Sequence, residues 1–528
     1  MGQNNLGTYL RTIKYLTLSQ IYYRILYIIK KRFFNKKYCS KNIYKNDSIY
    51  WKNLFYKSKS FEEKNSFRFL NKEKKFPSVD WNFMEYGKLW NYNLVYFDFL
   101  NQKDMDLNEG LNLINSFIKN DLSHISGHEP YTISLRNVNW IKFIVINKIE
   151  DQYIDDYIYN SYYRLLDNLE FHLMGNHLLE NGFSLLFGSY YFKNSNFYLR
   201  AKKIIVEQLD EQILNDGAHF ELSPMYHNII LERLLDSIFL IHNNNTFDDK
   251  EFNNTLINKA EKMISWLKNI EYRNGELPHF NDSTNNIALS NNKLFDYANI
   301  LKINDKKIPL KDSGYRKVNL DGYEFVLDVG PIGPDYIPGH GHADIFNFEL
   351  KIDNLPIIVD TGTSTYENNS KRQNERSTFA HNTITINKKN QSEVWSAFRV
   401  GRRARVNILS DEKNRVYASH NGYKNIGITH FRSFEFFKQK IIIKDSLKGN
   451  QKNIAESHIH FHPDRSVIMI SNNIIEVDKK IHLKFHGYKN IKIKDFKYCL
   501  GFNKNKTGKK IIADIKYESK IIIKLNEN

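Results

Sequence analysis

The hydrophobic pattern of the chain changes once, near residue 310, and this change constrains the fold more than any other feature. From about residue 80 to 305, apolar side chains recur every three or four residues, which is typical of helices packed on one face. At least six helices are expected, at Leu107–Lys119, Val138–Ile149, Tyr157–Phe171, Phe197–Leu214, Asn228–Ile241 and Leu256–Ile270. This run of helices before any strand signal predicts an α-only domain of antiparallel pairs, as a toroid or a bundle.

Strand signals dominate after that point, and turn signals separate many of them, which predicts an antiparallel sandwich. The expected strands are Tyr323–Val329, Phe346–Ile352, Arg403–Ile408, Phe434–Ile443, Ala455–Phe461, Lys480–Phe485 and Lys510–Ile515. We therefore predict a basic, aromatic-rich lead-in with a loop-like charged stretch at 71–75, then a helical domain and a β domain. Their ranges are 1–75, 76–308 and 309–528. The seam between the last two is the first place to expect a site.

Several side chains that are candidates for catalysis or metal binding lie close together in sequence, within residues 336–406. The alternation from His342 to Ile352 predicts a strand, and an Asp-Asn turn at 353–354 predicts a hairpin into the apolar run that ends in Asp360. A third strand is expected directly after His381. Three strand ends thus offer two imidazoles and a carboxylate, which are a common zinc ligand set. The same pattern also fits polar residues that are satisfied at strand ends and an aspartate that caps a turn.

Two stretches of the helical domain also carry polar side chains of chemical interest. In GNHLLENG, residues 175–182, His177 and Glu180 share one face if the segment is helical. The alternative is a plain helix start with Asn176 as its cap.

The second stretch is DGAHFELSPMYH, residues 216–227. Ser223 and Pro224 form a good helix opening, which puts Tyr226 in the first turn, where the positive end of the helix favours a phenolate. Tyr226 fits a buried core tyrosine equally well.

The charge and the cysteine content of the chain limit the classes of partner and of site that it can have. The 76 Lys and Arg residues against 59 Asp and Glu give a formal net charge of +17, which favours an acidic partner. Nucleic acid is the weakest such partner, because no recognised binding motif accompanies the charge. The two cysteines, far apart in sequence, exclude a disulfide framework and a CxxC metal site.

The segment at 15–31 is apolar but interrupted by polar and basic residues. It lacks the order of a signal peptide and is too short and too polar to span a bilayer. A basic amphipathic helix fits it, either packed on the protein or in peripheral contact with an anionic membrane.

Six motifs occur in the order found in the heparinase II/III-like polysaccharide lyases, which include the oligoalginate lyases. They are GNHLLENG, HFELSPMYH, GHGHAD, VDTGTSTYE, RSTFAHNT and QSEVWSAFRVGRRARV. The chain resembles that family over roughly 80–450, most strongly over 339–405. The resemblance implies an incomplete α/α toroid followed by an antiparallel β-sandwich. It also implies β-elimination of a uronate-containing acidic polysaccharide, such as a heparin or alginate type.

In the helical domain, the resemblance implies that Asn176 and His177 neutralise the uronate carboxylate. Glu180 matches a carboxylate that some heparinases keep and is expected to bind substrate. Tyr226 matches the tyrosine that acts as acid, and in syn elimination also as base.

In the β domain, the resemblance implies that His340 and Tyr366 belong to the active site. His342, Asp360 and His381 match the ligands of a structural Zn²⁺. Because His340 would face the cleft and His342 the metal, the backbone must turn between them, which a glycine there permits.

The sequence leaves several alternatives. Arg402 and Arg403 are candidates for binding a polyanion, or belong to a solvated strand face. Glycoside hydrolysis needs two carboxylates, for which Glu180 and Glu221 are available. A glycan-binding or assembly protein of polysaccharide export is the non-enzymatic alternative, against which the intact active-site motifs argue. The resemblance favours the cell envelope or periplasm and a role in surface-polysaccharide metabolism, whereas the missing export signal favours the cytoplasm.

Overall fold

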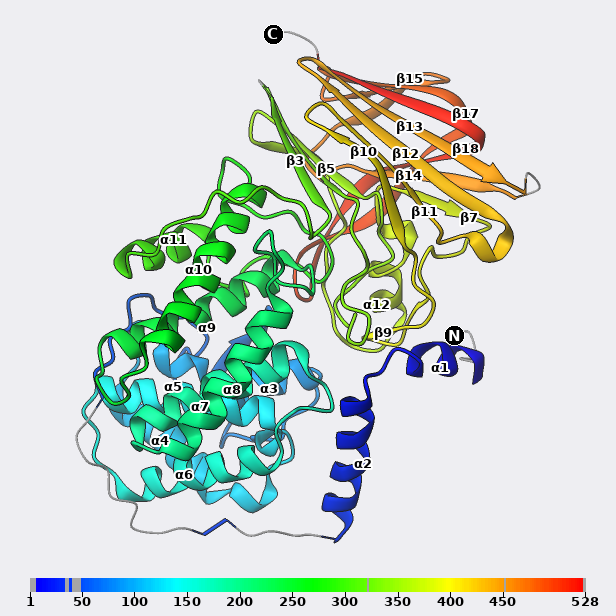
Figure 1. The fold of residues 1–528 in the computed structure, drawn as a ribbon. Coiled ribbons are helices and arrows are strands. Elements are labelled where there is room, and N and C mark those ends of the chain that lie inside the picture. The colour runs from blue at the N-terminus through cyan, green and yellow to red at the C-terminus, as the bar shows by residue number, and fades with distance from the viewer. Residues whose placement is uncertain (1–5, 34–37, 40–48, 321, 451–452, 526–528) are drawn as a thin grey trace.

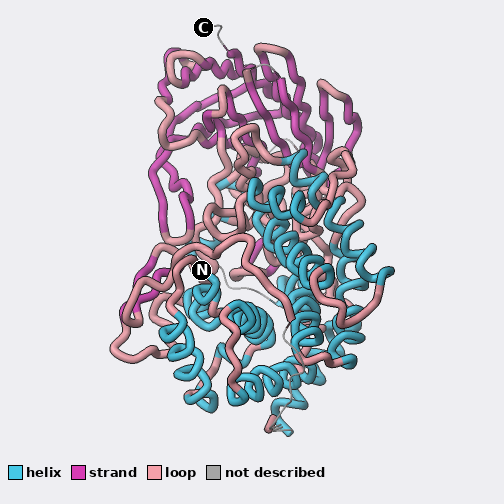
Figure 2. Tube along the Cα trace, turned by 90° about the vertical axis from the view of Figure 1, so that its left-hand side faces the viewer, coloured by secondary structure: helices cyan, strands magenta, loops and turns pink. Residues whose placement is uncertain are grey.

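A computed structural model describes residues 6–33, 38–39, 49–320, 322–450 and 453–525. The helices between residues 88 and 300 form one half of the molecule, and the strands from residue 315 onwards form the other (Figure 1). The view turned by 90° shows the same division between helices and strands (Figure 2). The predicted fold class, a helical domain followed by an antiparallel β domain, is confirmed.

The helical half is built from neighbouring helices that pack in pairs. Helix α7 packs on α5, α8 and α9, and α9 packs on α10 and α11. The helices of this half are α3 (Lys88–Tyr96), α4 (Leu107–Lys119), α5 (Pro130–Ile146), α6 (Gln152–Asp167), α7 (Gly175–Tyr191), α8 (Ser195–Gln212), α9 (Pro224–His242), α10 (Lys250–Ile270) and α11 (Asn291–Ile300). All but one residue of α7 is buried, so apolar residues lie on every side of it and its sequence carries no clear helical period.

The β half is a sandwich of two antiparallel sheets. The smaller sheet has the order β3 (Tyr315–Leu320), β4 (Tyr323–Asp328), β5 (Phe348–Ile352) and β6 (Leu355–Ile358). The larger sheet has the order β10 (Val406–Glu412), β11 (Arg415–His420), β12 (Ile428–Phe437), β13 (Lys440–Gly449), β18 (Lys504–Leu525), β17 (Ile481–Gly501), β16 (Ile474–Val477) and β15 (Val467–Ser471). Strand β14 (Ala455–His460) pairs with β18 and with β7 (Ile384–Ile386). Phe325 of the smaller sheet packs on Phe434 of the larger one, at 5.7 Å between ring centres.

Three expectations about elements were wrong. The expected strand Phe434–Ile443 is the end of β12, a turn and the start of β13, because the apolar run continues on both sides of a two-residue turn. The stretch at 71–75 is not a loop, since Lys72–Lys75 forms β2 and pairs with β1 (Ser66–Phe69), whose Phe67 is buried. The expected strand after His342 begins only at Phe348.

Helices α1 (Leu6–Ile13) and α2 (Leu18–Phe33) connect the two halves. Arg11 of α1 forms an ion pair with Glu393 of the β half, at 2.6 Å. Gln20 of α2 donates to the carbonyl oxygen of Leu173 in the helical half, at 3.1 Å. Within the described ranges, every helix is too short or too polar to cross a bilayer.

A second connection lies at the tip of the long β17–β18 hairpin. Asn71, in the turn between β1 and β2, donates to the carbonyl oxygen of Phe502 at this tip. Asn503 donates back to the carbonyl oxygen of Leu70. The ring of Phe502 also lies 5.0 Å from that of Tyr366, so the hairpin tip reaches the seam.

Candidate active site

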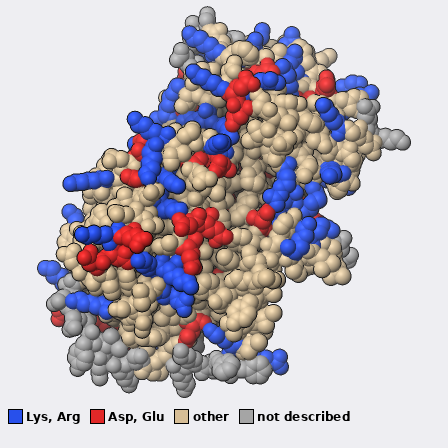
Figure 3. Space-filling view, in the orientation of Figure 1, with Lys and Arg blue, Asp and Glu red and all other residues tan. Residues whose placement is uncertain are grey.

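A cleft of about 1480 Å³ lies between the two halves. The five side chains predicted to be catalytic all line it, namely Asn176, His177, Tyr226, His340 and Tyr366. The first three come from the helical half and the last two from the β half, so the fold brings distant parts of the chain to one cavity. Lys and Arg side chains are scattered over both halves on the face shown in Figure 3, with acidic side chains among them.

Tyr226 stands at the start of α9, where the predicted helix opening is present. Pro224 occupies the first turn, and the side chain of Ser223 accepts a hydrogen bond from the backbone N–H of Tyr226. The Tyr226 ring lies 3.9 Å from the His340 ring, and the hydroxyl of Tyr366 donates to that of Tyr226 at 3.4 Å.

Burial decides the protonation of the two tyrosines. It raises the pKa of Tyr226 above its ordinary value, although the hydrogen bond from Tyr366 opposes the shift. Burial also raises the pKa of Tyr366 well above the ordinary value. The helix end therefore does not make Tyr226 a phenolate, and both side chains are neutral hydrogen-bond donors near pH 7.

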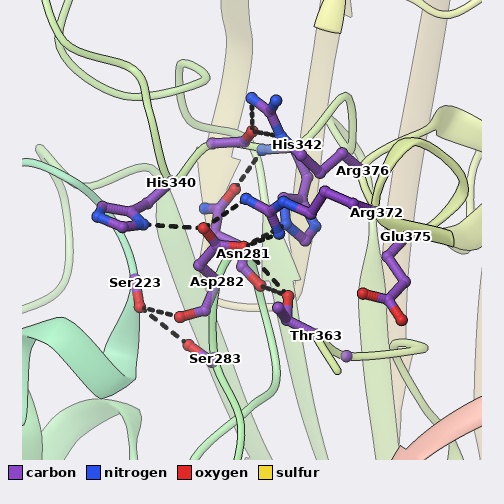
Figure 4. Close-up of polar contacts among 12 residues, drawn as sticks. Ser223, Asn281, Asp282, Ser283, His340, His342, Thr363, Arg372, Glu375 and Arg376 are labelled. Atoms are coloured by element: carbon purple, nitrogen blue, oxygen red, sulfur yellow. Dashed lines mark hydrogen bonds and ion pairs between the residues drawn. The ribbon is translucent and has the colours of Figure 1, made fainter. Parts of the chain in front are cut away.

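Asp282 is the residue that organises the β-domain side of the cleft, and the sequence analysis missed it. Its carboxylate lies 2.8 Å from Nδ1 of His340 and 3.0 Å from Nε2 of His342. Arg372 forms an ion pair with both of its oxygens (Figure 4), with Nη2 at 2.7 Å from Oδ2. Burial alone would raise the pKa of this carboxyl, but Arg372 and the two histidines hold it well below its usual range. Asp282 is therefore a carboxylate that fixes the His340 ring.

Gly341 separates the two histidines for a steric reason. Its backbone is not in the left-handed region, but a Cβ there would lie 2.0 Å from the carbonyl oxygen of Ile332. A glycine is needed because neighbouring backbone approaches closely, which is a different reason from the expected turn.

Asn176 and His177 lie at the start of α7. The cap position is Met174, with φ of 64°, so the alternative of Asn176 as the helix cap is wrong. The backbone N–H of Asn176 donates to Oε1 of Glu221 at 3.4 Å. The other oxygen of Glu221 lies 3.7 Å from Nε2 of His340, which links α7 to the β half.

His177 has an acidic partner. Its Nδ1 lies 3.0 Å from Oε1 of Glu170. Burial lowers the pKa of His177, but the charge and hydrogen bond of Glu170 more than offset this, and the net shift is upward. The cleft wall therefore favours an imidazolium at this position.

Three residues predicted to bind substrate lie in different surroundings. Glu180 is buried beside Arg233, at 3.1 Å, and is not among the residues that line the cleft. Arg402 is likewise not among them, and its guanidinium donates to the carbonyl oxygens of Gln391 and Gly422. Arg403 does line the cleft, with its guanidinium stacked 3.5 Å from the centre of the Tyr15 ring.

A group of metal-ligand side chains lies behind the cleft. Among the described residues, ligand atoms of Asp344, Asp360 and His381 lie within 4.8 Å of one another, and all three residues are buried. Two of these residues were expected, whereas Asp344 was missed although it stands in the quoted motif GHGHAD. The third expected ligand, His342, lies beside the group, with its ring 5.3 Å from that of His381.

Unpaired polar atoms test whether this group fits a metal ion. Nδ1 of His342, Nε2 of His381 and Oδ2 of Asp344 are buried without a hydrogen-bond partner among the described residues. Buried polar atoms are normally paired, and nitrogen and carboxylate oxygen atoms in this combination suit a divalent cation. The group could therefore hold a metal.

Known proteins match both halves of the chain. Residues 131–307 match the family described as "Heparinase II/III N-terminus", and residues 303–525 match "Heparinase II/III-like, C-terminal". Proteins named heparin-sulfate lyase from Bacteroides stercoris and Pedobacter heparinus are 26% and 25% identical over 325 and 320 residues. These matches cover 54% of this chain but 45% and 46% of the relatives, so the chain matches about half the length of each.

A crystal structure of heparinase III has the same fold. It aligns over 100% of this chain and 93% of its own, with a TM-score of 0.61 and 15% sequence identity. The two family profiles together run from residue 131 to 525 and meet where the helical half passes into the β half. The chain belongs to the heparinase II/III-like family.

Proposed function

We propose that the protein is a polysaccharide lyase that cleaves a uronate-containing acidic glycan by β-elimination. The observation that carries this proposal is the close contact of the Tyr226 and His340 rings across the two halves, at 3.9 Å between ring centres. The same cleft is lined by Asn176 and His177, which offer an amide and an imidazole to a carboxylate. The name of the two relatives, heparin-sulfate lyase, supports a substrate of this class.

The chemistry requires three kinds of group. Elimination breaks the C5–H and C4–O4 bonds of the uronate and forms a C4=C5 double bond. The C5 proton becomes removable when the adjacent carboxylate is neutralised, because charge then spreads into it. We assign this task to Asn176 and to His177, whose raised pKa favours the cationic form. A base must take the proton from C5, and an acid must give one to the departing O4.

The surroundings of Tyr226 and His340 favour one assignment of the acid and the base. A neutral Tyr226 is suited to protonate O4, since burial raises its pKa. His340 is suited to take the C5 proton at Nε2, because Asp282 holds Nδ1 at 2.8 Å. Tyr366 would position Tyr226 through their hydroxyl contact. In syn elimination, Tyr226 would instead serve as both acid and base.

Glycoside hydrolysis is less well supported. It needs two carboxylates that face each other across the bound sugar. Glu221 lines the cleft, but Glu180 is buried against Arg233 and is not a lining residue. Glu180 and Glu221 therefore do not face each other across the cleft.

We further infer that the group around Asp344, Asp360 and His381, together with His342, holds a structural Zn²⁺. Two imidazoles and carboxylate oxygens match the ligand preference of this ion. When bound, it would neutralise buried carboxylates and tie the loop that carries His340 to the start of β7. The proton transfers themselves would take place in the cleft, at His340 and Tyr226.

Metal analysis tests this inference. Protein purified without chelator should contain about one zinc per chain, and removal of the ion with a chelator should lower the melting temperature. His381→Ala should lose the zinc, whereas His486→Gln, on the distant strand β17, should retain it. Stoichiometric zinc in the His381→Ala protein would contradict the assignment.

A substrate screen tests the lyase proposal. The C4=C5 product absorbs in the ultraviolet, so uronate polymers with and without sulfate can be compared directly. At least one such polymer should give rising absorbance and shorter chains. Shorter chains without absorbance would indicate hydrolysis, and the lyase proposal fails if no uronate polymer is cleaved. A Tyr226→Phe protein that performs its full cellular role would favour the non-catalytic alternative.

A further inference from the structure

Helix α2 presents apolar side chains to solvent. Leu18, Tyr22, Ile25 and Ile28 are 86%, 60%, 55% and 69% exposed, and their spacing places them along one side of the helix. The other exposed large apolar residues of α1 and α2 are Leu6, Tyr9, Leu10, Ile13, Ile21 and Ile29. The surface at the lower right of Figure 3, where α1 and α2 lie, is mostly uncharged and carries a few Lys and Arg side chains. We call this apolar side of the two helices the docking face.

The side of α2 that faces the protein carries its polar side chains together with Tyr23, whose ring stacks on that of Phe171. Gln20 donates to the carbonyl oxygen of Leu173 at 3.1 Å, and Arg24 to that of His172 at 3.0 Å. Lys30 donates to the carbonyl oxygen of Asp167, also at 3.0 Å. A surface helix normally buries its apolar side and exposes its polar side. Packing within the chain therefore accounts for Tyr23 and Tyr27 but not for the apolar side chains that α2 exposes.

The charge of the two helices indicates what covers the docking face. Residues 6–33 contain six basic side chains and no acidic one. A second copy of this chain would bring two such basic segments together, within a protein of net charge +17. An anionic lipid surface would instead attract the basic residues and accept the apolar ones.

We propose that α1 and α2 dock the protein on an anionic membrane surface. The apolar side chains would enter the boundary between headgroups and acyl chains, and Lys14, which is exposed, would lie among the headgroups. Thr12, Leu16, Gln20 and Arg24 of the same segment line the cleft. Docking would therefore hold the cleft mouth near the membrane. This proposal goes beyond the proposed function and does not depend on it.

Vesicle sedimentation tests the proposal with the full chain. The protein should pellet with vesicles of phosphatidylcholine and about one-third phosphatidylglycerol, and much less with phosphatidylcholine alone, at about 0.1 M salt. The variant with Leu18→Ser, Ile25→Ser and Ile28→Ser should bind the anionic vesicles at least about tenfold more weakly. Lys14→Glu should weaken binding and reduce its salt dependence.

The chain offers a matched control on β15. Ile468, Met469 and Ile470 are 46%, 40% and 48% exposed, so the variant with Ser at these three positions removes similar apolar surface elsewhere. It should bind like the parent protein, and both triple variants should keep the parent melting temperature.

Three results would overturn the proposal. The first is that the parent protein ignores anionic vesicles, a comparison that needs no variant. The second is equal loss of binding in the two triple variants. The third is a concentration-dependent dimer in light scattering that only the α2 variant abolishes, because the docking face would then be covered by a second copy.

Discussion

Tyr226→Phe should lower kcat on a cleaved glycan by about a thousandfold while leaving KM nearly unchanged. The substitution removes one hydroxyl, and positioned acid–base groups contribute about 10²–10⁴-fold to rate. The ring would still contact His340, so substrate should bind as before. Initial rates of ultraviolet absorbance, measured over a range of substrate concentrations, separate the two constants.

Tyr56→Phe is the matched control for this prediction. Tyr56 also lines the cleft but is 49% exposed, and no catalytic role is assigned to it. Its variant should keep a rate close to that of the parent. If Tyr226→Phe retained the parent kcat, the acid would have to be another group, and Tyr366 would be the next candidate.

Asp282→Asn should be among the most destabilising single substitutions in the β half. It removes the ion-pair partner of the buried Arg372 guanidinium, and breaking a buried pair of this kind costs about 3–5 kcal/mol of the free energy of unfolding. It also removes the negative charge beside Nδ1 of His340 and replaces one of the two acceptor oxygens by an amide donor, so His340 is held less firmly and activity should fall as well. Urea unfolding measures the first effect and the absorbance assay the second.

Two further variants separate stability from positioning. Asp495→Asn breaks an exposed pair with Lys509 and should leave the free energy of unfolding almost unchanged. Asp282→Leu combined with Arg372→Met replaces both buried charges and should recover much of the stability, but no activity. Recovery of activity in this double variant would show that Asp282 does not position His340.

The pH dependence of the stability follows from the lowered pKa of Asp282. A carboxyl whose pKa is lower in the folded chain stabilises the fold fully above its unfolded pKa, which is about 4. This contribution is lost as pH falls further, through the folded pKa. The difference in stability between the parent and Asp282→Asn should therefore be constant near neutral pH and shrink below about pH 4.

The sequence predicted the features that depend on local physics. Leu107–Lys119 is a helix with the bounds expected, because it is amphipathic and begins after Asp106, which caps it. The hairpin at 353–354 is also present, with both residues at positive φ. These signals lie within a few residues of the element that they define.

The features that were missed depend on contacts between distant residues. Asp282 meets His340 and Arg372 across 58 and 90 positions, and it stands in a loop with no periodic pattern. Helix α7 has apolar residues on every side because neighbouring helices surround it, so its period is lost. The sequence predicts Arg402 as a surface cation, but in the fold its guanidinium donates hydrogen bonds to backbone carbonyl groups.

The reach of the β17–β18 hairpin has a consequence for how far the two halves can move apart. Its tip is tied to the turn at Asn71 on one side of the molecule, while Arg11 holds Glu393 through the N-terminal segment. Because these two contacts join the halves, a hinge motion that widens the cleft must first break one of them. The spacing between Tyr226 and His340 is therefore set in part by residues that never touch a sugar, and shortening the hairpin should loosen it.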